Sequence, residues 1–125
     1  KEEEPKEKKR SEPKKEEGII TIDQFLQTSL KIGTIIEAKE VKKSNRLLLL
    51  KVDIGEENPR QIVAGIKEFY KPKELLNTQV CVVANLKPAK LMGMLSEGML
   101  LAAKDKNGLS LLRPESPKEV GTKVS

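Results

Sequence analysis

A series of short apolar runs, each closed by turn-forming residues, constrains the fold of this chain more than any other feature. The runs are rich in Val, Ile and Leu, and Gly, Pro, Asn or Asp residues separate them. They cover residues 30–41, 47–54, 61–66, 79–86 and 98–104, and a return segment covers residues 109–113. Short runs of this composition between turn signals are typical of β-strands. The turn sequence DKNG at residues 105–108 adds a hairpin signal before the return segment. The sequence therefore predicts an all-β fold.

Two short helices are predicted beside the strands. Thr21 and Gln24 have the spacing of a capping box, in which each side chain satisfies a backbone N–H group of the other residue, and a helix over about residues 22–28 follows. Pro72 favours the first turn of a second helix over residues 71–77. Five strands with a short helix between the third and the fourth are the order of a five-stranded OB-fold barrel. A generic small β-barrel remains the alternative.

Residues 1–17 differ in composition from the rest of the chain. They hold seven of the 24 Lys and Arg residues and seven of the 19 Asp and Glu residues, so the whole net charge of +5 falls in residues 18–125. A segment whose only apolar residues are prolines cannot offset the entropy of ordering, so we predict a disordered Lys/Glu-rich linker before the domain at residues 18–125. A basic arm that binds nucleic acid is the alternative, which the alternating charges disfavour. Because the chain begins with Lys1 and not Met, we expect a fragment or a processed form of a longer protein.

The residue types that enzymes and metal sites use are scarce. The chain has no His and one Cys, which excludes Ser-His-Asp and Cys-His catalytic groups, an internal disulfide and a zinc site built from His and Cys. The acidic cluster of Asp53, Glu56 and Glu57 is interpreted as a solvated turn, and Cys81 as a small core residue. We therefore predict no catalytic residues, no metal and no cofactor.

The chain shows no signal for a membrane. No apolar run approaches the roughly 18 residues that cross a bilayer, and the N-terminus shows no apolar signal segment. A lone Cys fits a reducing compartment. We expect a cytoplasmic protein.

Two basic loops favour nucleic-acid binding. Five Lys and Arg residues surround the connection between the first two strands: Lys39, Lys42, Lys43, Arg46 and Lys51. Lys87 and Lys90 lie in the connection between the fourth and fifth strands, and residues 75–96 contain no acid. In an OB-fold both connections flank the nucleic-acid face, where Lys and Arg attract phosphates and release counterions. The alternative is that Lys-rich loops only keep the protein soluble.

The aromatic residues are too few for a long stacking platform. Phe25, Phe69 and Tyr70 are the aromatic residues of the chain, and Phe25 is expected to pack against Ile20 in a hydrophobic staple at the start of the first helix. OB domains that bind single strands stack successive bases on exposed aromatic rings. Recognition of a folded RNA by backbone and shape needs fewer aromatic side chains. The composition therefore favours structured RNA.

Four motifs follow one another in a consistent order: SNRL at residues 44–47, VAGI at 63–66, ANLKPAKLMG at 84–93 and SEGMLLAA at 96–103. Together they resemble the tRNA-binding OB domain. That family is found at the C-terminus of many methionyl-tRNA synthetases, in free-standing tRNA-binding proteins and in the endothelial-monocyte-activating-polypeptide family. The resemblance runs from about residue 20 to the end of the chain.

The resemblance implies a noncatalytic module that binds the outer corner of L-shaped tRNA by shape and backbone. The tRNA-binding residues that it implies are Lys42, Lys43, Ser44, Asn45, Arg46, Lys87, Lys90, Ser96 and Met99. Lys and Arg would contact phosphates, and Ser and Asn would donate to phosphate or ribose oxygens. Met99 would pack on a sugar or base, or lie in the core instead. The linker and the missing initiator Met look like a C-terminal appendix of methionyl-tRNA synthetase, with a synthetase catalytic domain on the same chain.

The second strand raises the question of a partner. If Leu48 and Leu50 point inward, Leu47 and Leu49 point outward, and an exposed apolar pair usually means that another surface covers it. The N-terminal helix and a second subunit are the candidates. Since the family forms homodimers through its terminal segments, we predict a homodimer. The alternative function is a homodimeric protein-interaction or chaperone module on the same barrel.

Overall fold

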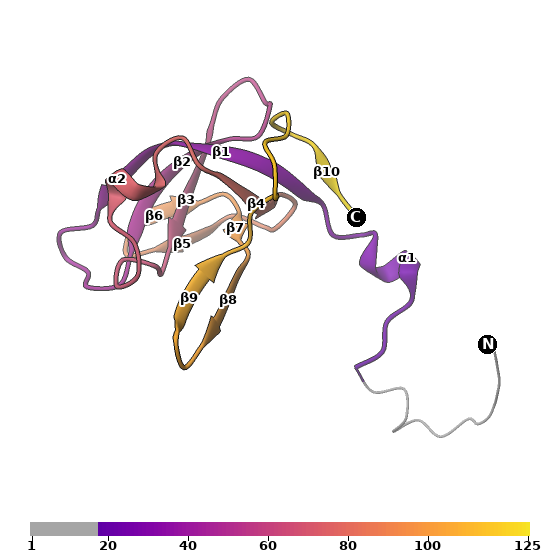
Figure 1. Ribbon diagram of the computed structural model, residues 1–125, viewed down its shortest axis with the longest axis horizontal. Helices are drawn as coiled ribbons and strands as arrows, with labels where there is room; N and C mark the ends of the chain where they lie inside the picture. The colour runs from indigo at the N-terminus through magenta and orange to yellow at the C-terminus, as the bar shows by residue number, and fades with distance from the viewer. Residues whose placement is uncertain (1–17) are drawn as a thin grey trace.

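An antiparallel barrel occupies the positions that the apolar runs predict (Figure 1). The computed structural model describes residues 18–125, so the predicted linker at residues 1–17 lies outside the described residues. The helices are α1 (Ile22–Phe25) and α2 (Pro72–Leu75). The strands are β1 (Leu30–Glu40), β2 (Leu48–Asp53), β3 (Arg60–Ala64), β4 (Gln79–Val83), β5 (Ala89–Leu91), β6 (Met94–Ser96), β7 (Met99–Leu100), β8 (Ala102–Asp105), β9 (Gly108–Leu111) and β10 (Lys123–Val124). The predicted five-strand barrel with two short helices is confirmed.

The main sheet runs in the order β3-β2-β1-β4-β7, and its two ends nearly meet. The backbone N–H of Glu97, just before β7, donates to the carbonyl of Gln61 in β3 at 2.7 Å. One long strand serves both halves of the barrel, because β1 pairs with β4 over Leu30–Thr34 and with β2 over Thr34–Glu40. This closure leaves few open strand edges.

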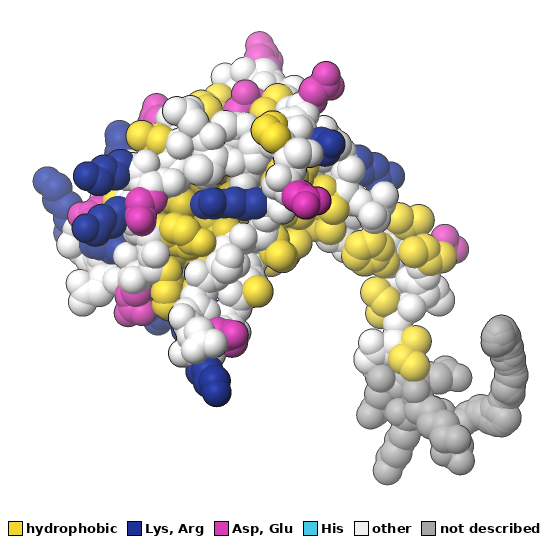
Figure 2. Space-filling model, viewed as in Figure 1, with side chains coloured by type: hydrophobic (Ala, Val, Ile, Leu, Met, Phe, Trp, Pro, Cys, Tyr) yellow, Lys and Arg dark blue, Asp and Glu magenta, His cyan; other side chains and the backbone are white. Residues whose placement is uncertain are grey.

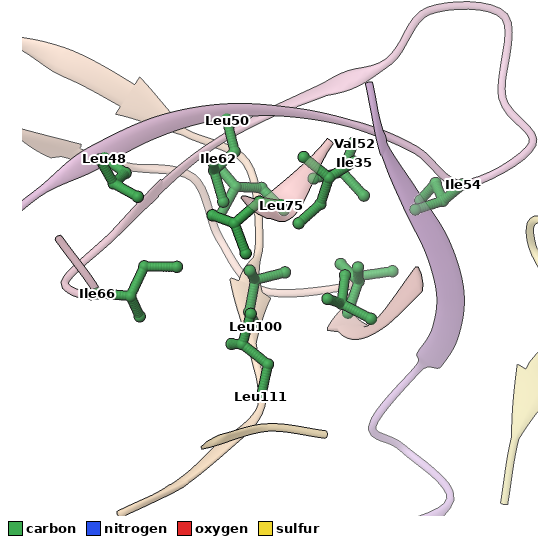
Figure 3. Close-up of a cluster of buried hydrophobic side chains, with 13 residues drawn as sticks. Ile35, Leu48, Leu50, Val52, Ile54, Ile62, Ile66, Leu75, Leu100 and Leu111 are labelled. Carbon is green, nitrogen blue, oxygen red and sulfur yellow. The ribbon is translucent and has the colours of Figure 1, made fainter. Parts of the chain in front are cut away.

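Alternation along β2 fills the core. Leu48, Leu50 and Val52 point inward and are fully buried, as the sequence predicts. Figure 3 shows the side chains of Leu48 and Leu50 with Ile62, Leu75, Leu100 and Leu111 from other parts of the chain. Full burial of each aliphatic side chain contributes about 1.5–3 kcal/mol.

The prediction that Leu47 and Leu49 form an exposed apolar pair is wrong. Both side chains are half-buried, and Leu49 lies between its cross-strand neighbours Lys39 and Val63. The helix α1 does not cover them, because it lies at the other end of the molecule, beyond the start of β1 (Figure 1).

Three parts of the fold differ from the predictions. The connection between the fourth and fifth strands contains a two-stranded hairpin, β5–β6, whose turn at Met92 and Gly93 has φ values of 51° and 80°. The predicted strand over residues 98–104 is divided into β7 and β8, since β8 leaves the barrel to pair with β9 in the predicted 105–108 hairpin. A final strand, β10, pairs with the start of β1.

The helices are shorter than predicted, although the first begins as expected. Gln24 N–H donates to the Thr21 hydroxyl at 3.1 Å, and Thr21 N–H donates to the Gln24 side-chain oxygen at 2.8 Å, which completes the capping box. Pro72 opens α2. No helix within residues 18–125 has the length and apolar character needed to span a bilayer.

Gly33 lies where β1 passes from one half of the barrel to the other. A Cβ atom there would lie 2.7 Å from Cγ1 of Val52 and 2.8 Å from Cγ2 of Ile54, both on stiff β-branched side chains. The pairing of β1 with β2 has a shift in register between Ile35 and Glu37, two residues further along. Gly33 is therefore required for close packing.

Gly33→Ala should lower the free energy of unfolding by about 1–3 kcal/mol, because the added methyl overpacks the core. Urea denaturation measures this change. Gly65→Ala is the matched control, since the only atom near a Cβ at Gly65 is the Arg46 carbonyl oxygen, at 4.0 Å. Equal losses in the two variants would contradict the packing argument.

Candidate nucleic-acid interface

The first basic loop, residues 41–47, connects β1 to β2 and carries Lys42, Lys43 and Arg46 on its surface. The Ser44 hydroxyl oxygen fixes the turn, because it accepts from the backbone N–H of Arg46 at 3.0 Å and of Leu47 at 3.1 Å. These bonds leave the hydroxyl hydrogen of Ser44 available. Asn45 is exposed at the tip.

Lys67 holds this loop against the end of β3. Its ammonium group donates to the carbonyl of Ser44 at 2.8 Å and to that of Val41 at 3.4 Å. Its backbone N–H donates to the carbonyl of Arg46 at 3.1 Å. Lys67 therefore fixes the conformation of the first basic loop through three of its carbonyl groups. The sequence does not predict this role, because no local pattern shows that Lys67 lies next to the loop.

The basic hairpin, residues 86–96, carries Lys87 and Lys90 and contains β5 and β6. Lys90 lies opposite Leu95 in the register, so both side chains project from the same face. The carbonyl of Leu95 accepts from the Gln61 side-chain amide at 2.8 Å. The hairpin is thereby attached along the edge of β3.

Ser96 is buried and serves the hairpin itself. Its hydroxyl oxygen accepts from the backbone N–H of Val63 at 3.0 Å, and the hydroxyl donates to the carbonyl of Gly98 at 3.1 Å. Its exposed fraction is 7%. The hydroxyl hydrogen is used inside the protein, so in this conformation Ser96 positions the turn and has no donor left for a phosphate. Met99 is exposed on β7 and does not lie in the core.

The guanidinium of Arg60 joins the two segments that flank the basic hairpin. Its Nη1 donates to the carbonyl of Glu97 at 2.9 Å and also to the carbonyl of Ala84. Its Nε and Nη2 donate to the two carboxylate oxygens of Glu56 at 2.9 and 2.8 Å. The hydrogen bonds from Arg60 lower the pKa of Glu56, and those to Glu56 raise the pKa of Arg60. The acidic turn predicted to be solvated thus contributes one carboxylate to this clamp.

Asn85 ties the start of the basic hairpin to the segment between α1 and β1. Its side-chain oxygen accepts from the backbone N–H of Ser29 at 2.9 Å, and its side-chain NH₂ donates to the carbonyl of Gln27 at 2.6 Å. A single Asn after a buried strand gives no sequence signal for such a distant contact.

The first basic loop and the basic hairpin lie along the same strand. The basic hairpin is bonded to β3 from Gln61 to Val63, and the first basic loop meets the chain just after β3 through Lys67. Figure 2 shows Lys and Arg side chains gathered over the left edge of the molecule, where Figure 1 places the first basic loop. This concentration of positive charge attracts phosphates.

The aromatic side chains are engaged inside the domain. The Tyr70 hydroxyl accepts from the backbone N–H of Leu111 at 3.1 Å, and the Lys104 ammonium lies 5.3 Å from the centre of the Phe69 ring. Phe25 is half-buried. Bases of an extended single strand would find few open rings here.

The described residues offer few groups for metal binding or for a reactive thiol. Within residues 18–125, no three His, Cys, Asp or Glu side chains come together to hold a metal ion. Cys81 is buried, as predicted, and burial raises the pKa of its thiol, which lowers its reactivity. The arrangement is suited to binding an anion along basic loops.

Comparison with known proteins agrees with this geometry. A sequence profile of the tRNA binding domain family matches residues 30–123. The chain is 50% identical to the methionine–tRNA ligase of Helicobacter pylori over 117 residues, which are 94% of this chain and 18% of that protein. It therefore spans about a sixth of the length of the ligases that it matches.

Solved structures share the fold over their whole length. A MetRS related protein from Pyrococcus horikoshii superposes with a TM-score of 0.79 at 33% identity, over 86% of this chain and 98% of that one. Chaperone CsaA from Bacillus anthracis gives a TM-score of 0.77 at 30% identity, over 86% of this chain and 100% of that one. On the profile match and these relatives, the chain belongs to the tRNA-binding domain family.

Proposed function

We propose that this chain is a noncatalytic C-terminal appendix of a methionyl-tRNA synthetase in the cytoplasm. It binds tRNA by recognising the phosphate backbone and the shape of the RNA. The observation that carries the proposal is the placement of both basic elements along β3, with no acid between residues 75 and 96. The 50% identity to a methionine–tRNA ligase supports the attachment to a synthetase. An attached binding module raises the local concentration of tRNA at a catalytic domain.

Each proposed contact follows from the position of its side chain. Five exposed cationic residues of the first basic loop and the basic hairpin bind phosphates: Lys42, Lys43, Arg46, Lys87 and Lys90. The Ser44 hydroxyl and the Asn45 amide donate to phosphate or ribose oxygens. Met99 packs on a sugar or base, while Ser96 acts indirectly by holding the turn.

Lys87→Glu with Lys90→Glu should abolish most tRNA binding and leave the fold intact. Both side chains are exposed, so charge reversal removes two phosphate contacts and adds repulsion without disturbing the core. Filter binding at several salt concentrations measures the affinity and its salt dependence, which should be steep between about 50 and 200 mM.

The matched control reverses the same charge elsewhere. Lys104→Glu with Lys106→Glu changes two exposed residues at the β8–β9 hairpin and should weaken binding much less. If the two double variants bind tRNA equally well, the assignment of the interface fails.

We also propose that the chain forms a homodimer through its terminal segments. The helix α1 has no buried residue, and four large apolar side chains around it are exposed: Ile19, Ile20, Ile22 and Leu26. An open groove of about 520 Å³ lies between the start of β1, β4 and the C-terminal segment. Its apolar lining includes Leu101, Leu112 and Val124. One chain thus carries both an uncovered apolar helix and an apolar groove, which together favour a second copy as the partner.

Leu112→Asp should convert the dimer to a monomer, because a carboxylate in the groove would have to be buried at the interface. Leu112 is 48% exposed, so the substitution spares the core. Light scattering at micromolar concentration measures the mass against the 14.0 kDa of one chain. Leu76→Asp, at a similarly exposed position after α2, is the control and should remain dimeric. A single 14.0 kDa species in the unaltered protein would reject the dimer.

A homodimeric protein-interaction or chaperone module on the same barrel is the second candidate, and the likeness to chaperone CsaA favours it. Its ligand would be an apolar peptide, bound at a surface that the dimer leaves open. Peptide binding of that kind responds little to salt, whereas tRNA binding weakens steeply. The salt titration above therefore separates the two functions.

A further inference from the structure

The basic hairpin and the strand after it expose apolar side chains as well as basic ones. Five large apolar residues of residues 86–99 are between 40% and 56% exposed: Leu86, Leu91, Met92, Leu95 and Met99. Phosphate binding alone gives no reason for this, because apolar side chains contribute nothing to an ion contact. Because Leu91 pairs with Met94 and Leu95 pairs with Lys90, Leu91 and Leu95 project from opposite faces of the hairpin. Exposed apolar side chains therefore surround its tip, where they can contact a partner.

The tip of the hairpin carries a residue that its own turn disfavours. Met92 has a φ of 51° and Gly93 a φ of 80°, so both residues of the turn are in the left-handed region. Asn, Asp and Gly suit the first position of such a turn, and Met is sterically disfavoured there. Met92 is also the most exposed of the five apolar residues. Turn stability does not explain this choice of side chain.

Hydrogen bonds to β3 hold the strands that carry the tip. The hydroxyl oxygen of Ser96 accepts from Val63 N–H at 3.0 Å, and the side-chain amide of Gln61 donates to the Leu95 carbonyl at 2.8 Å. These bonds attach β6 to β3, so the turn projects from a held edge. Lys90 and Leu95 lie side by side as cross-strand partners.

The charge of the surroundings indicates what the tip contacts. Lys87 comes just before β5 and Lys90 lies in it, so both basic residues lead into the tip, and residues 75–96 contain no acid. The nearest acid in sequence after them, Glu97, accepts the backbone N–H of Gln61 at 3.0 Å. A second copy docking here would bring like charges together. Unstacked bases at the corner of a folded RNA present apolar faces next to phosphates, which matches an apolar tip next to ammonium groups.

We propose that the tip of the β5–β6 hairpin, led by Met92, is a wedge that packs against unstacked bases of the bound tRNA. The proposal rests on the proposed function, and it adds a base-contacting site to an interface that otherwise binds the backbone. The wedge supplies affinity that does not depend on counterion release.

Met92→Asn tests the wedge, since Asn suits the left-handed turn but removes the apolar side chain. Urea denaturation should show equal or greater stability, while tRNA affinity should fall by roughly five- to thirtyfold. The slope of log affinity on log salt should stay unchanged, because no charge is lost. In contrast, Lys90→Ala should make that slope shallower by roughly 0.7–0.9.

Two controls test whether the loss of affinity is specific to the hairpin tip and to unstacked bases. Leu76→Asn removes a comparably exposed apolar side chain next to α2 and should leave the affinity unchanged. A fully paired RNA duplex, which has no unstacked base, should bind equally to the unaltered protein and to Met92→Asn.

The outcomes are distinguishable from those of the proposed function. If the unaltered protein binds tRNA and Met92→Asn binds it as tightly, the wedge is rejected and the proposed function stands. If Met92→Asn instead changes the mass in light scattering, the tip contacts another copy and the wedge is also rejected. If the unaltered protein does not bind tRNA at low salt, the proposed function itself fails.

Discussion

The placement of the basic hairpin depends on the side chain of Arg60. A guanidinium presents five N–H donors in one plane, and Arg60 uses them on the Glu56 carboxylate and on the carbonyls of Ala84 and Glu97. Those two carbonyls stand at the two ends of the segment that contains the basic hairpin. A lysine could not bond in this way, because its ammonium group is a compact charge without the planar fork. The position of Lys87 and Lys90 in space therefore rests on a cation that is not itself presented to a ligand.

The basic residues of this domain divide by task. Arg60 and Lys67 donate to backbone carbonyls and to Glu56, so their charges build the loops. Lys87 and Lys90 project from a hairpin whose backbone is already held, so their charges remain for a ligand. A count of positive charges does not make this distinction. A binding surface built in this way would lose little conformational freedom on binding a ligand, since its loops are already held by hydrogen bonds.

The sequence predicts the parts of the fold that local patterns control. Alternation along residues 47–54 identifies the inward face of β2, and the Thr21–Gln24 spacing identifies the start of α1. The sequence does not predict β10, because two residues carry no periodic pattern and their pairing with β1 depends on the path of the whole chain. It also does not predict β5–β6, since the turn has Met92 where Asn or Gly is usual. The basic loops are visible from composition, whereas the clamps at Arg60 and Lys67 require tertiary contacts between residues far apart in the chain.

Asn85 connects the surface proposed for tRNA with the segment proposed for the dimer. Its amide bonds to Gln27 and Ser29, which follow α1, and it lies two residues before Lys87. The backbone N–H of Ala84 also donates to the Ser29 carbonyl at 2.7 Å. In a dimer built through α1, these bonds would fix the orientation of each basic hairpin relative to the dimer axis. Two hairpins held at a set separation can engage one folded RNA together, and simultaneous engagement strengthens binding only when the geometry allows both contacts. In such a dimer, the short path from α1 through Asn85 to Lys87 would supply that constraint without a separate rigid element.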